Sequence, residues 1–353
     1  MCYSKIVFNR KTLLKGLREV KKGASSSLYK TASPLNAVMF RKIRGGAILR
    51  IFNGEAWLSR FVPTTGEDFS PFACHVQELY KLIKSFSGDE VNLTPGEALY
   101  VEGEGVKIDL PLVKTGALVL PPGGMPKTWQ PFSFSPSILK ALENSCSKNK
   151  ARPQYNGLSI QVRGGDLHAA TTDRAQFLHV VTPTQHPEIS VVVPGEVLIT
   201  LSKLSGPEEI FFAAHNKNVV FRKGKNILLS KLLNVEFPYY SELLDFDSMI
   251  FRPLTLANFL TSAKQASIND TRPFHSFFLG FSSYLRTCKG NIAVPYSTDK
   301  PFQTGFDLKL LSKGLEKLQK AGAKEIEICF AGKLQPLFIR AENMTYLLMP
   351  VAS

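Results

Sequence analysis

Two Gly-Gly pairs are the sequence features that could form a ligand site. They lie in VRGGDLHAATTD, Val162 to Asp173, and in IRGGAILRIFNG, Ile43 to Gly54. A glycine-rich turn can cradle a phosphate with its backbone amides, or it can connect two strands where positive φ is required. A catalytic loop seldom needs a second copy in one chain. Repetition therefore favours a hairpin turn that belongs to the architecture.

Residues that could catalyse a reaction show no motif spacing. Six histidines are spread along the chain, at His75, His168, His179, His186, His215 and His275. None belongs to an HExxH pair, and neither GxSxG nor GxxxxGK[ST] occurs. Asp173 could serve a nuclease, but an acid in a repeated hairpin is typical of a turn. The five cysteines form no CxxC pair, which argues against disulfides or zinc. We expect no enzymatic activity, no cofactor and no metal.

The charge indicates a polyanionic partner. Lys and Arg number 43 and Asp and Glu 29, so the 353-residue chain carries a formal charge of +14. Such an excess favours nucleic acid, although charge alone does not separate DNA, RNA and an acidic membrane surface. No apolar run of about 18 residues occurs, and the first residues lack the apolar stretch of a signal peptide. We expect a cytoplasmic protein without a membrane anchor.

The elements that must position these residues repeat along the chain. An amphipathic helix precedes each Gly-Gly hairpin, and a second helix followed by three strand-like runs comes after it. A third copy of this unit closes the chain. The predicted helices span 8–20, 76–86, 134–146, 194–206, 254–266 and 306–322. Boundaries expected in the stretches 119–132 and 243–248 predict three domains, 1–125, 126–245 and 246–353.

Two of these helices carry a stripe of cations opposite their apolar face. The stripes comprise Lys11, Lys15, Arg18 and Lys22 on the first helix, and Lys309, Lys313, Lys317 and Lys320 on the last. A stripe can be an ordinary solvated face. Two stripes in a repeated, basic chain favour contact with phosphates. Because no stacking motif or zinc-finger spacing accompanies them, we expect binding that ignores base sequence.

Three segments, in this order and spacing, resemble the bacterial DNA polymerase III beta subunit, the beta sliding clamp family. They are ARPQYNGLSIQVRGGDLHAATTDRAQFL (151–178), LLNVEFPYY (232–240) and YLLMPV (346–351), and the resemblance covers essentially the whole chain. It implies an α+β fold of three tandem DNA-clamp domains, each with two helices packed on antiparallel β-sheets. It also implies a head-to-tail homodimeric ring that encircles duplex DNA, with helices around the hole. Such a clamp tethers DNA polymerase and has no chemistry of its own.

The resemblance also implies a cleft between the second and third domains that binds short linear peptides of polymerases and clamp-loader subunits. Its residues would be Gln154, Tyr155, Thr172, Arg174, Ala175, Gln176, Phe177, Pro238, Leu243, Phe274, Asp307, Leu310, Pro336, Leu347, Met349, Pro350 and Val351. The alternative for Phe177, Leu347 and Met349 is an ordinary core position in a strand. For the dimer, the edge strand 105–112 should pair with the partner near 267–274 and bury Ile108 against Ile268.

The chain departs from the family pattern at the rim of this cleft. Where the family usually has TDGHR, this chain has TDRAQ (172–176), and it ends MPVAS instead of MPMRL. Tyr239 replaces the aspartate of FPDY. We therefore expect a cleft with altered peptide preference. The strong positive charge is unusual for the family, and it is compatible with a clamp of phage or plasmid origin or with an otherwise divergent clamp. A monomeric basic protein that coats DNA or RNA without ring closure is the alternative.

Overall fold

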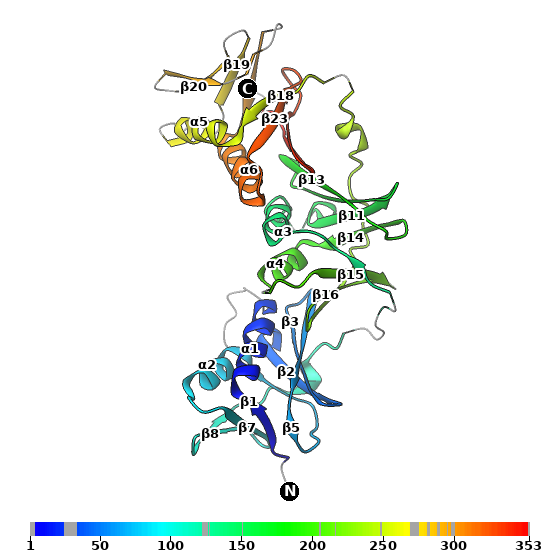
Figure 1. Ribbon diagram of the computed structural model, residues 1–353, viewed down its shortest axis with the longest axis vertical. Helices are drawn as coiled ribbons and strands as arrows, with labels where there is room; N and C mark the ends of the chain where they lie inside the picture. Colours follow the sequence, from blue (N-terminus) through cyan, green and yellow to red (C-terminus); the bar gives the residue numbers. More distant parts are fainter. Residues whose placement is uncertain are drawn as a thin grey trace. The chain divides into compact units, whose positions relative to one another are not determined.

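The computed structural model describes residues 4–24, 34–121, 126, 128–149, 151–204, 206–215, 217–247, 249–268, 275–280, 283–287, 290–294, 296–297 and 301–351. Contacts within the chain divide it into two compact units (Figure 1). The first unit comprises 1–133 and 203–232, and the second comprises 134–202 and 233–353. This division splits the middle copy of the repeat, so the boundaries of three repeat-based domains remain a prediction.

The first unit holds two antiparallel sheets and two helices, α1 (Arg10–Val20) and α2 (Val76–Ser85). The smaller sheet runs in the order β5 (Thr65–Gly66), β1 (Ile6–Asn9), β7 (Glu90–Pro95), β8 (Leu99–Gly103), β9 (Val106–Leu110). The larger runs in the order β10 (Gln130–Pro131), β15 (Ile210–His215), β16 (Asn218–Lys223), β17 (Asn226–Lys231), β4 (Ala56–Pro63), β3 (Gly46–Phe52), β2 (Ala37–Ile43), β6 (Phe72–His75). α1 buries Leu13, Leu17 and Val20 completely, and it packs on β3 and β4.

The second unit repeats this arrangement with α3 (Pro136–Glu143), α4 (Gly195–Lys203), α5 (Leu256–Ile268) and α6 (Leu308–Ala321). Its larger sheet has the order β14 (Ile189–Pro194), β11 (Gly157–Arg163), β12 (Asp166–Thr172), β13 (Gln176–Pro183), β25 (Met344–Leu348), β24 (Leu337–Ala341), β23 (Glu325–Phe330), β18 (Arg252–Thr255). Its smaller sheet has the order β21 (Gly290–Val294), β20 (Ser283–Thr287), β19 (His275–Leu279), β22 (Phe302–Phe306). α6 packs against both α5 and α3.

All six predicted helices are confirmed to within a few residues, and local capping explains several of their ends. The side chain of Asn9 accepts a hydrogen bond from Thr12 N, and Ser135 does the same for Ile138 N. Asp307 caps α6 by accepting from two backbone amides, and Gly322, with φ of 113°, ends it. No helix within the described ranges is long and apolar enough to cross a membrane.

The Gly-Gly pairs lie at hairpin turns, as the repetition predicts, with Arg44 and Gly45 as the loop of the first and Gly164 and Gly165 as the loop of the second. Ile43 pairs with Gly46 across the first turn, and Arg163 pairs with Asp166 across the second. Gly164 and Gly165 have φ of 59° and 83°, the conformation that a two-residue hairpin loop demands of both positions. A Cβ built at either glycine would meet no atom within 4 Å, so positive φ rather than a close approach requires them.

Equivalent strands join consecutive copies of the repeat by the same rule. β17, the last strand of the second copy, pairs antiparallel with β4, the strand that ends the first hairpin region of the first copy. β25, the last strand of the third copy, pairs in the same way with β13 of the second copy. We call the β4–β17 pair with its turn 53–56 the first junction, and the β13–β25 pair with its turn 173–176 the second junction. Each junction lies inside one compact unit.

Candidate functional site

The turn of the second junction is held rigidly by side chains. Asp173 Oδ1 accepts hydrogen bonds from Ala175 N at 3.0 Å and from Gln176 N at 2.9 Å. Thr172 Oγ1 donates to Gln176 O at 2.7 Å and accepts from Arg174 N at 3.0 Å. The chain's last segment attaches to the same turn, because Met349 N donates to Ala175 O at 2.9 Å. The turn therefore presents Arg174 and Ala175 to solvent on a fixed backbone.

An aromatic and apolar cluster lies beneath this turn. Its buried members are Ala170, Phe177, Tyr240, Cys329, Phe338 and Leu347, and the partly buried Phe237, Leu244, Phe246, Met249 and Phe251 pack against it. Phe177 is 5% exposed and Leu347 0%, and the ring of Tyr240 lies 5.3 Å from that of Phe177. These two side chains occupy core positions, as the alternative interpretation had it. Among the predicted cleft residues, Met349, 38% exposed, and Leu243 present apolar side chains to solvent.

The remaining residues predicted for the cleft lie in several segments of the second unit. Pro238, Pro350 and Val351 are half-buried, and Pro336 is buried next to the start of β24. Gln154 and Tyr155 lie in the short 3-10 turn Pro153–Tyr155 that precedes β11. Asp307 caps α6, as described above, and Leu310 follows it in the first turn of that helix. Phe274, and the last two residues of the chain, fall outside the described residues.

Gln176 is a buried link between three elements rather than part of an exposed rim. Its Oε1 accepts a hydrogen bond from Lys317 Nζ at 2.8 Å and another from the hydroxyl of Tyr346 at 3.2 Å. Its Nε2 donates to Asp173 Oδ2 at 2.8 Å. Gly314 allows α6 to lie this close, since a Cβ there would collide with the Tyr346 ring. The Gln176 side chain therefore connects the turn to β25 and α6.

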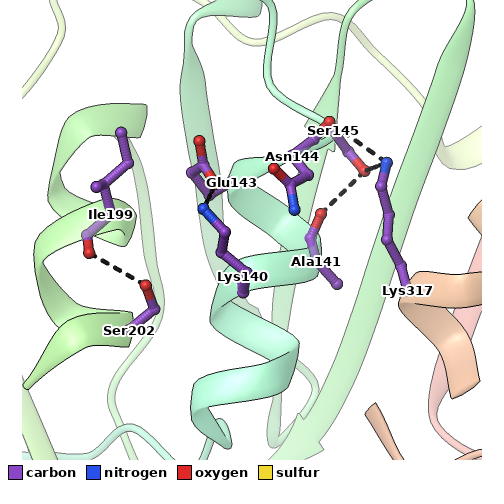
Figure 2. Close-up of polar contacts among 8 residues, drawn as sticks. All are labelled: Lys140, Ala141, Glu143, Asn144, Ser145, Ile199, Ser202 and Lys317. Atoms are coloured by element: carbon purple, nitrogen blue, oxygen red, sulfur yellow. Dashed lines mark hydrogen bonds and ion pairs between the residues drawn. The ribbon is translucent and has the colours of Figure 1, made fainter. Parts of the chain in front are cut away.

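Lys317 reaches from α6 to the end of α3, as Figure 2 shows. Its Nζ donates to Ser145 Oγ at 3.1 Å and to Asn144 O at 3.3 Å, in addition to Gln176. Burial lowers the pKa of Lys317 to about 8, and the nearby Lys313 adds to this effect, while Asp173 opposes it. The lysine stripe predicted a solvent-facing cation here. The structure instead places Lys317 among hydrogen-bond acceptors, because α6 packs against α3.

A cavity of about 750 Å³ opens beside Lys317 between α3 and α6. Its charged lining consists of Lys140, Lys148, Lys313, Lys317 and Lys320 and a single carboxylate, Glu316. We call it the lysine cavity. Glu316 is shared, because it pairs with Lys264 at 2.7 Å and lies 4.0 Å from Lys320. Lys140 pairs with the buried Glu143, so the remaining lysines give the cavity a net positive potential.

Six of the eight predicted stripe residues are exposed: Lys11, Lys15, Arg18, Lys309, Lys313 and Lys320. Lys22 is not. α1 ends at Val20, and Lys22 lies in the 3-10 turn Lys21–Gly23, where the helical period no longer applies. Its side chain is largely buried and pairs with Glu19 at 2.6 Å. Lys22 and Lys317 are thus drawn into the structure. The other six form two exposed basic faces, although Lys11 also pairs with Asp89 at 3.4 Å and Lys320 with Glu316 at 4.0 Å.

The smaller sheets end in β5 and β9 and in β21 and β22, and two of these edge strands, β9 and β21, are equivalent to strands that form the junctions. β9 pairs along its length with β8 alone among the described strands, and its Ile108 is 38% exposed. β21 likewise pairs with β20 alone in the described part of its sheet. The edge expected near 267–274 is different from this: Ser267 and Ile268 are the last residues of α5, and 269–274 lie outside the described residues. The predicted contact of the Ile268 side chain lies outside what the structure describes.

One histidine pair escaped the sequence analysis. His168 Nδ1 and His179 Nε2 lie 3.1 Å apart, and their rings stack. Burial lowers the pKa of His179 to about 3, with the neighbouring His168 and Arg163 adding to it. The register could have revealed the pair, because a hairpin that turns near 173–175 puts these two positions diagonally across β12 and β13. In the described part of the chain, no three His, Cys, Asp or Glu side chains could hold a metal ion.

Comparisons with a family model and with curated proteins both find the DNA polymerase III beta subunit, or beta sliding clamp. Residues 135–239 match the model described as DNA polymerase III beta subunit, central domain. The beta sliding clamp of Bacillus subtilis is 24% identical over 63% of each chain, so the match spans under two thirds of that relative. The beta sliding clamp of Rickettsia bellii is 20% identical over 98% of this chain and 99% of its own.

Solved structures show the same fold over the full length. The Bacillus subtilis sliding clamp covers 100% of both chains with a TM-score of 0.87 at 17% identity. The Helicobacter pylori beta clamp, solved bound to a DNA ligase peptide, covers 99% of this chain and 100% of its own, with a TM-score of 0.80 at 17% identity. The α+β fold expected from the sequence is confirmed.

Proposed function

Because the chain belongs to the beta sliding clamp family, we propose that it is a processivity clamp. In this proposal it encircles duplex DNA as a homodimeric ring and tethers a DNA polymerase, clamp-loader subunits and other partners through short linear peptides. It does so at the replication site in the cytoplasm, with the three repeat-based domains as its building blocks. The role requires no chemistry, only topology and contact surfaces.

The pattern of strand junctions is the observation that carries the proposal. Within the chain, the last strand of each later copy pairs with the preceding copy, as β17 does with β4 and β25 with β13. Two described strands that are equivalent to junction strands have no junction partner: β9, the last strand of the first copy, and β21, which corresponds in the third copy to β4 and β13. A head-to-tail pair of chains would join β9 to the partner's β21 twice. That closes a ring by the rule already used inside the chain.

The exposed side chains of these strands suit such a pairing. In the β8–β9 hairpin, Ile108 occupies the position that Leu228 occupies in β17 and Tyr346 in β25, and both of those are buried at their junctions. We infer that Ile108 becomes buried in the same way, opposite Ile292 of β21 in the partner. Ile268, at the end of α5, stays a predicted contact from the family resemblance. An unpaired edge with exposed apolar residues is otherwise an aggregation hazard.

Duplex DNA would be held through phosphates. The exposed cations of α1 and α6 (Lys11, Lys15, Arg18, Lys309, Lys313 and Lys320) form basic faces without an accompanying base-reading motif. Contacts of this kind are independent of sequence and weaken with salt, which suits a protein that slides. Phosphate contacts would also account for the formal charge of +14.

Peptide partners would bind at the surface of the second junction. Met349 and Leu243 supply exposed apolar side chains, and the rigid turn supplies Arg174 and Ala175. The Helicobacter pylori clamp carries a DNA ligase peptide, which supports the same type of partner here. Because Arg174 adds bulk and charge, we expect weak affinity for a standard bacterial clamp-binding peptide. The peptide of this clamp's own polymerase should bind more tightly.

Retention on circular DNA tests the function against its alternative. The protein is assembled on nicked circular DNA with its cognate loader, challenged with salt, and followed before and after the circle is cut. A ring stays on the closed circle and is lost from the linear form, because only topology holds it. A monomeric protein that coats nucleic acid would be lost equally from both, and that result would refute the proposal.

A further inference from the structure

The lysine cavity and the turn of the second junction share two side chains. Gln176 and Lys317 both line the cavity, and both belong to the hydrogen-bond network that fixes the turn. A ligand that enters the cavity would meet Gln176 and Lys317, which belong to the network that supports the turn of Arg174 and Ala175. The two surfaces are therefore connected by one direct hydrogen bond, from Lys317 Nζ to Gln176 Oε1 at 2.8 Å.

Lys317 is a cation held by neutral oxygens. Its three donors satisfy a backbone carbonyl, a hydroxyl and an amide, and within the described residues it forms no ion pair. Around it the cavity carries four more lysines against one shared carboxylate. Burial lowers its pKa to about 8, so most molecules at neutral pH keep the charge in an unfavourable environment. Asp173 and Glu143 favour the charged form electrostatically, but in the described part of the chain neither carboxylate bonds Nζ, so a directly bound anion is the partner that this site lacks.

Phosphate is the anion chemistry that the cavity fits. Several lysine ammonium groups around about 750 Å³ can bind several oxygens at once, and each charge-assisted bond is stronger than a bond to a neutral carbonyl. Lys317 would therefore exchange its neutral acceptors for phosphate oxygens. Gln176 would keep Tyr346 and Asp173 but lose its cationic donor.

We propose that the lysine cavity binds phosphate groups through Lys317. This binding breaks the hydrogen bond from Lys317 to Gln176 and thereby weakens peptide binding at the turn of the second junction. The proposal rests on the peptide-binding function proposed above. The sign follows from preorganisation: a turn that has lost one of its supporting hydrogen bonds must be ordered again when a peptide binds. Linkage requires the reverse effect as well, so bound peptide weakens phosphate binding by the same factor.

The test measures both affinities on the full-length protein at constant ionic strength. The peptide probe is the labelled DNA ligase peptide, read by fluorescence anisotropy. The phosphate probes are inorganic tripolyphosphate, and a short DNA duplex in a second arm. Saturating tripolyphosphate should raise the peptide dissociation constant about fivefold, and saturating peptide should raise that of tripolyphosphate equally. An effect of the duplex alone assigns the site to a DNA backbone, and one of tripolyphosphate alone assigns it to free phosphate chains.

Variants separate the link from the rest of the cavity. Lys317→Met and Gln176→Leu should each bring the coupling factor to one, and agreement between the two argues against a folding defect in either. Two further variants serve as controls. Lys313→Met, also in the lysine cavity, should weaken tripolyphosphate binding yet keep the coupling factor at saturation. Lys324→Met, which removes a charge from the same unit outside this cavity, should behave as wild type in every measurement.

Four outcomes overturn the proposal. Both ligands can bind without affecting each other, which leaves the clamp function intact and removes only the coupling. The coupling can persist in Lys317→Met and Gln176→Leu, which assigns it to another route. If neither tripolyphosphate nor duplex binds, the cavity is no phosphate site, and if the peptide does not bind, the peptide-binding function fails together with this inference.

Discussion

The two junctions use one backbone design with different side chains. In the first, Asn53 Oδ1 accepts hydrogen bonds from Glu55 N at 3.0 Å and Ala56 N at 2.8 Å. In the second, Asp173 Oδ1 accepts from the corresponding amides at 3.0 and 2.9 Å. Gly54 and Arg174 follow these caps with φ of 102° and 82°. The same turn thus precedes an aromatic residue, Trp57 or Phe177, in each.

What surrounds that aromatic residue differs. Trp57 Nε1 donates to Val119 O at 2.8 Å, and its ring stacks on Phe52 at 4.6 Å, so the chain's own linker covers the first junction. At the second, Gln176 replaces the small Ala56 and connects the turn to Lys317. The comparison indicates that the backbone supplies a rigid turn at both sites, while the side chains around it differ; in the function we propose, they leave the second junction available to partners.

A third junction between two chains would extend the comparison, and breaking it should have the largest effect. Ile108→Asp places an unpaired charge in both interfaces of the ring, where burial costs several kcal/mol. We expect the dimer dissociation constant to rise about 100-fold or more, measured by analytical ultracentrifugation. Ile292→Asp should act alike, whereas Lys107→Gln, the neighbour of Ile108 in β9, should leave the dimer intact. A dimer that survives both aspartate variants would place the interface elsewhere.

Acid should destabilise the second junction more than the first. His179 has a folded pKa of about 3, below the ordinary 6.5, so below pH 6.5 the unfolded chain binds a proton that the folded chain excludes. The free energy of unfolding at the second junction should therefore fall with falling pH, by up to about 1.4 kcal/mol per pH unit.

Hydrogen exchange in β12 and β13 reports this loss, and fluorescence of Trp57 and Trp129 reports the first unit. His179→Phe should remove most of the slope. Equal acid sensitivity of both units, or a slope that the variant does not change, would contradict the role of this histidine.

Peptide binding should distinguish the junctions next. Met349→Ala removes exposed apolar surface at the second junction, and we expect roughly tenfold weaker peptide binding, about 1.4 kcal/mol. Leu120→Ala removes a side chain that is 63% exposed in the linker over the first junction, and should change nothing. The measurement is peptide titration by calorimetry. The reverse result would assign the partner site to the first junction.

The smallest effect concerns the turn itself. Arg174 holds a left-handed conformation that costs a non-glycine residue roughly 1–2 kcal/mol. Arg174→Gly should therefore stabilise the second unit by about 0.5–1 kcal/mol, after allowing for the flexibility of glycine in the unfolded chain. Gly54→Ala should destabilise the first unit by a similar amount. Denaturant melts of each variant check both signs, and a loss of stability in Arg174→Gly would mean that its side chain stabilises the turn.

Sequence periodicity was sufficient for the helices and hairpins, because caps such as Ser135 and Asp307 and the glycines at 164–165 act locally. It failed where a tertiary contact decides. Lys317 lies on the predicted stripe, yet packing of α6 on α3 turns it into a buried link. Phe177 and Leu347, whose place in the peptide cleft stays a prediction, are buried in one cluster with Tyr240. No spacing rule contains these neighbours, since they come from distant segments.

Covalent closure of the ring tests the central claim most directly. Asp109→Cys and Asn291→Cys place one cysteine in each open edge strand, at positions that face each other if β9 and β21 pair as the other junctions do. After oxidation of the double variant loaded on circular DNA, the protein should stay on the circle in detergent and leave when the circle is cut. Either single variant should be lost at once. A double variant that forms no interchain disulfide, or that detergent strips from intact circles, would contradict the ring.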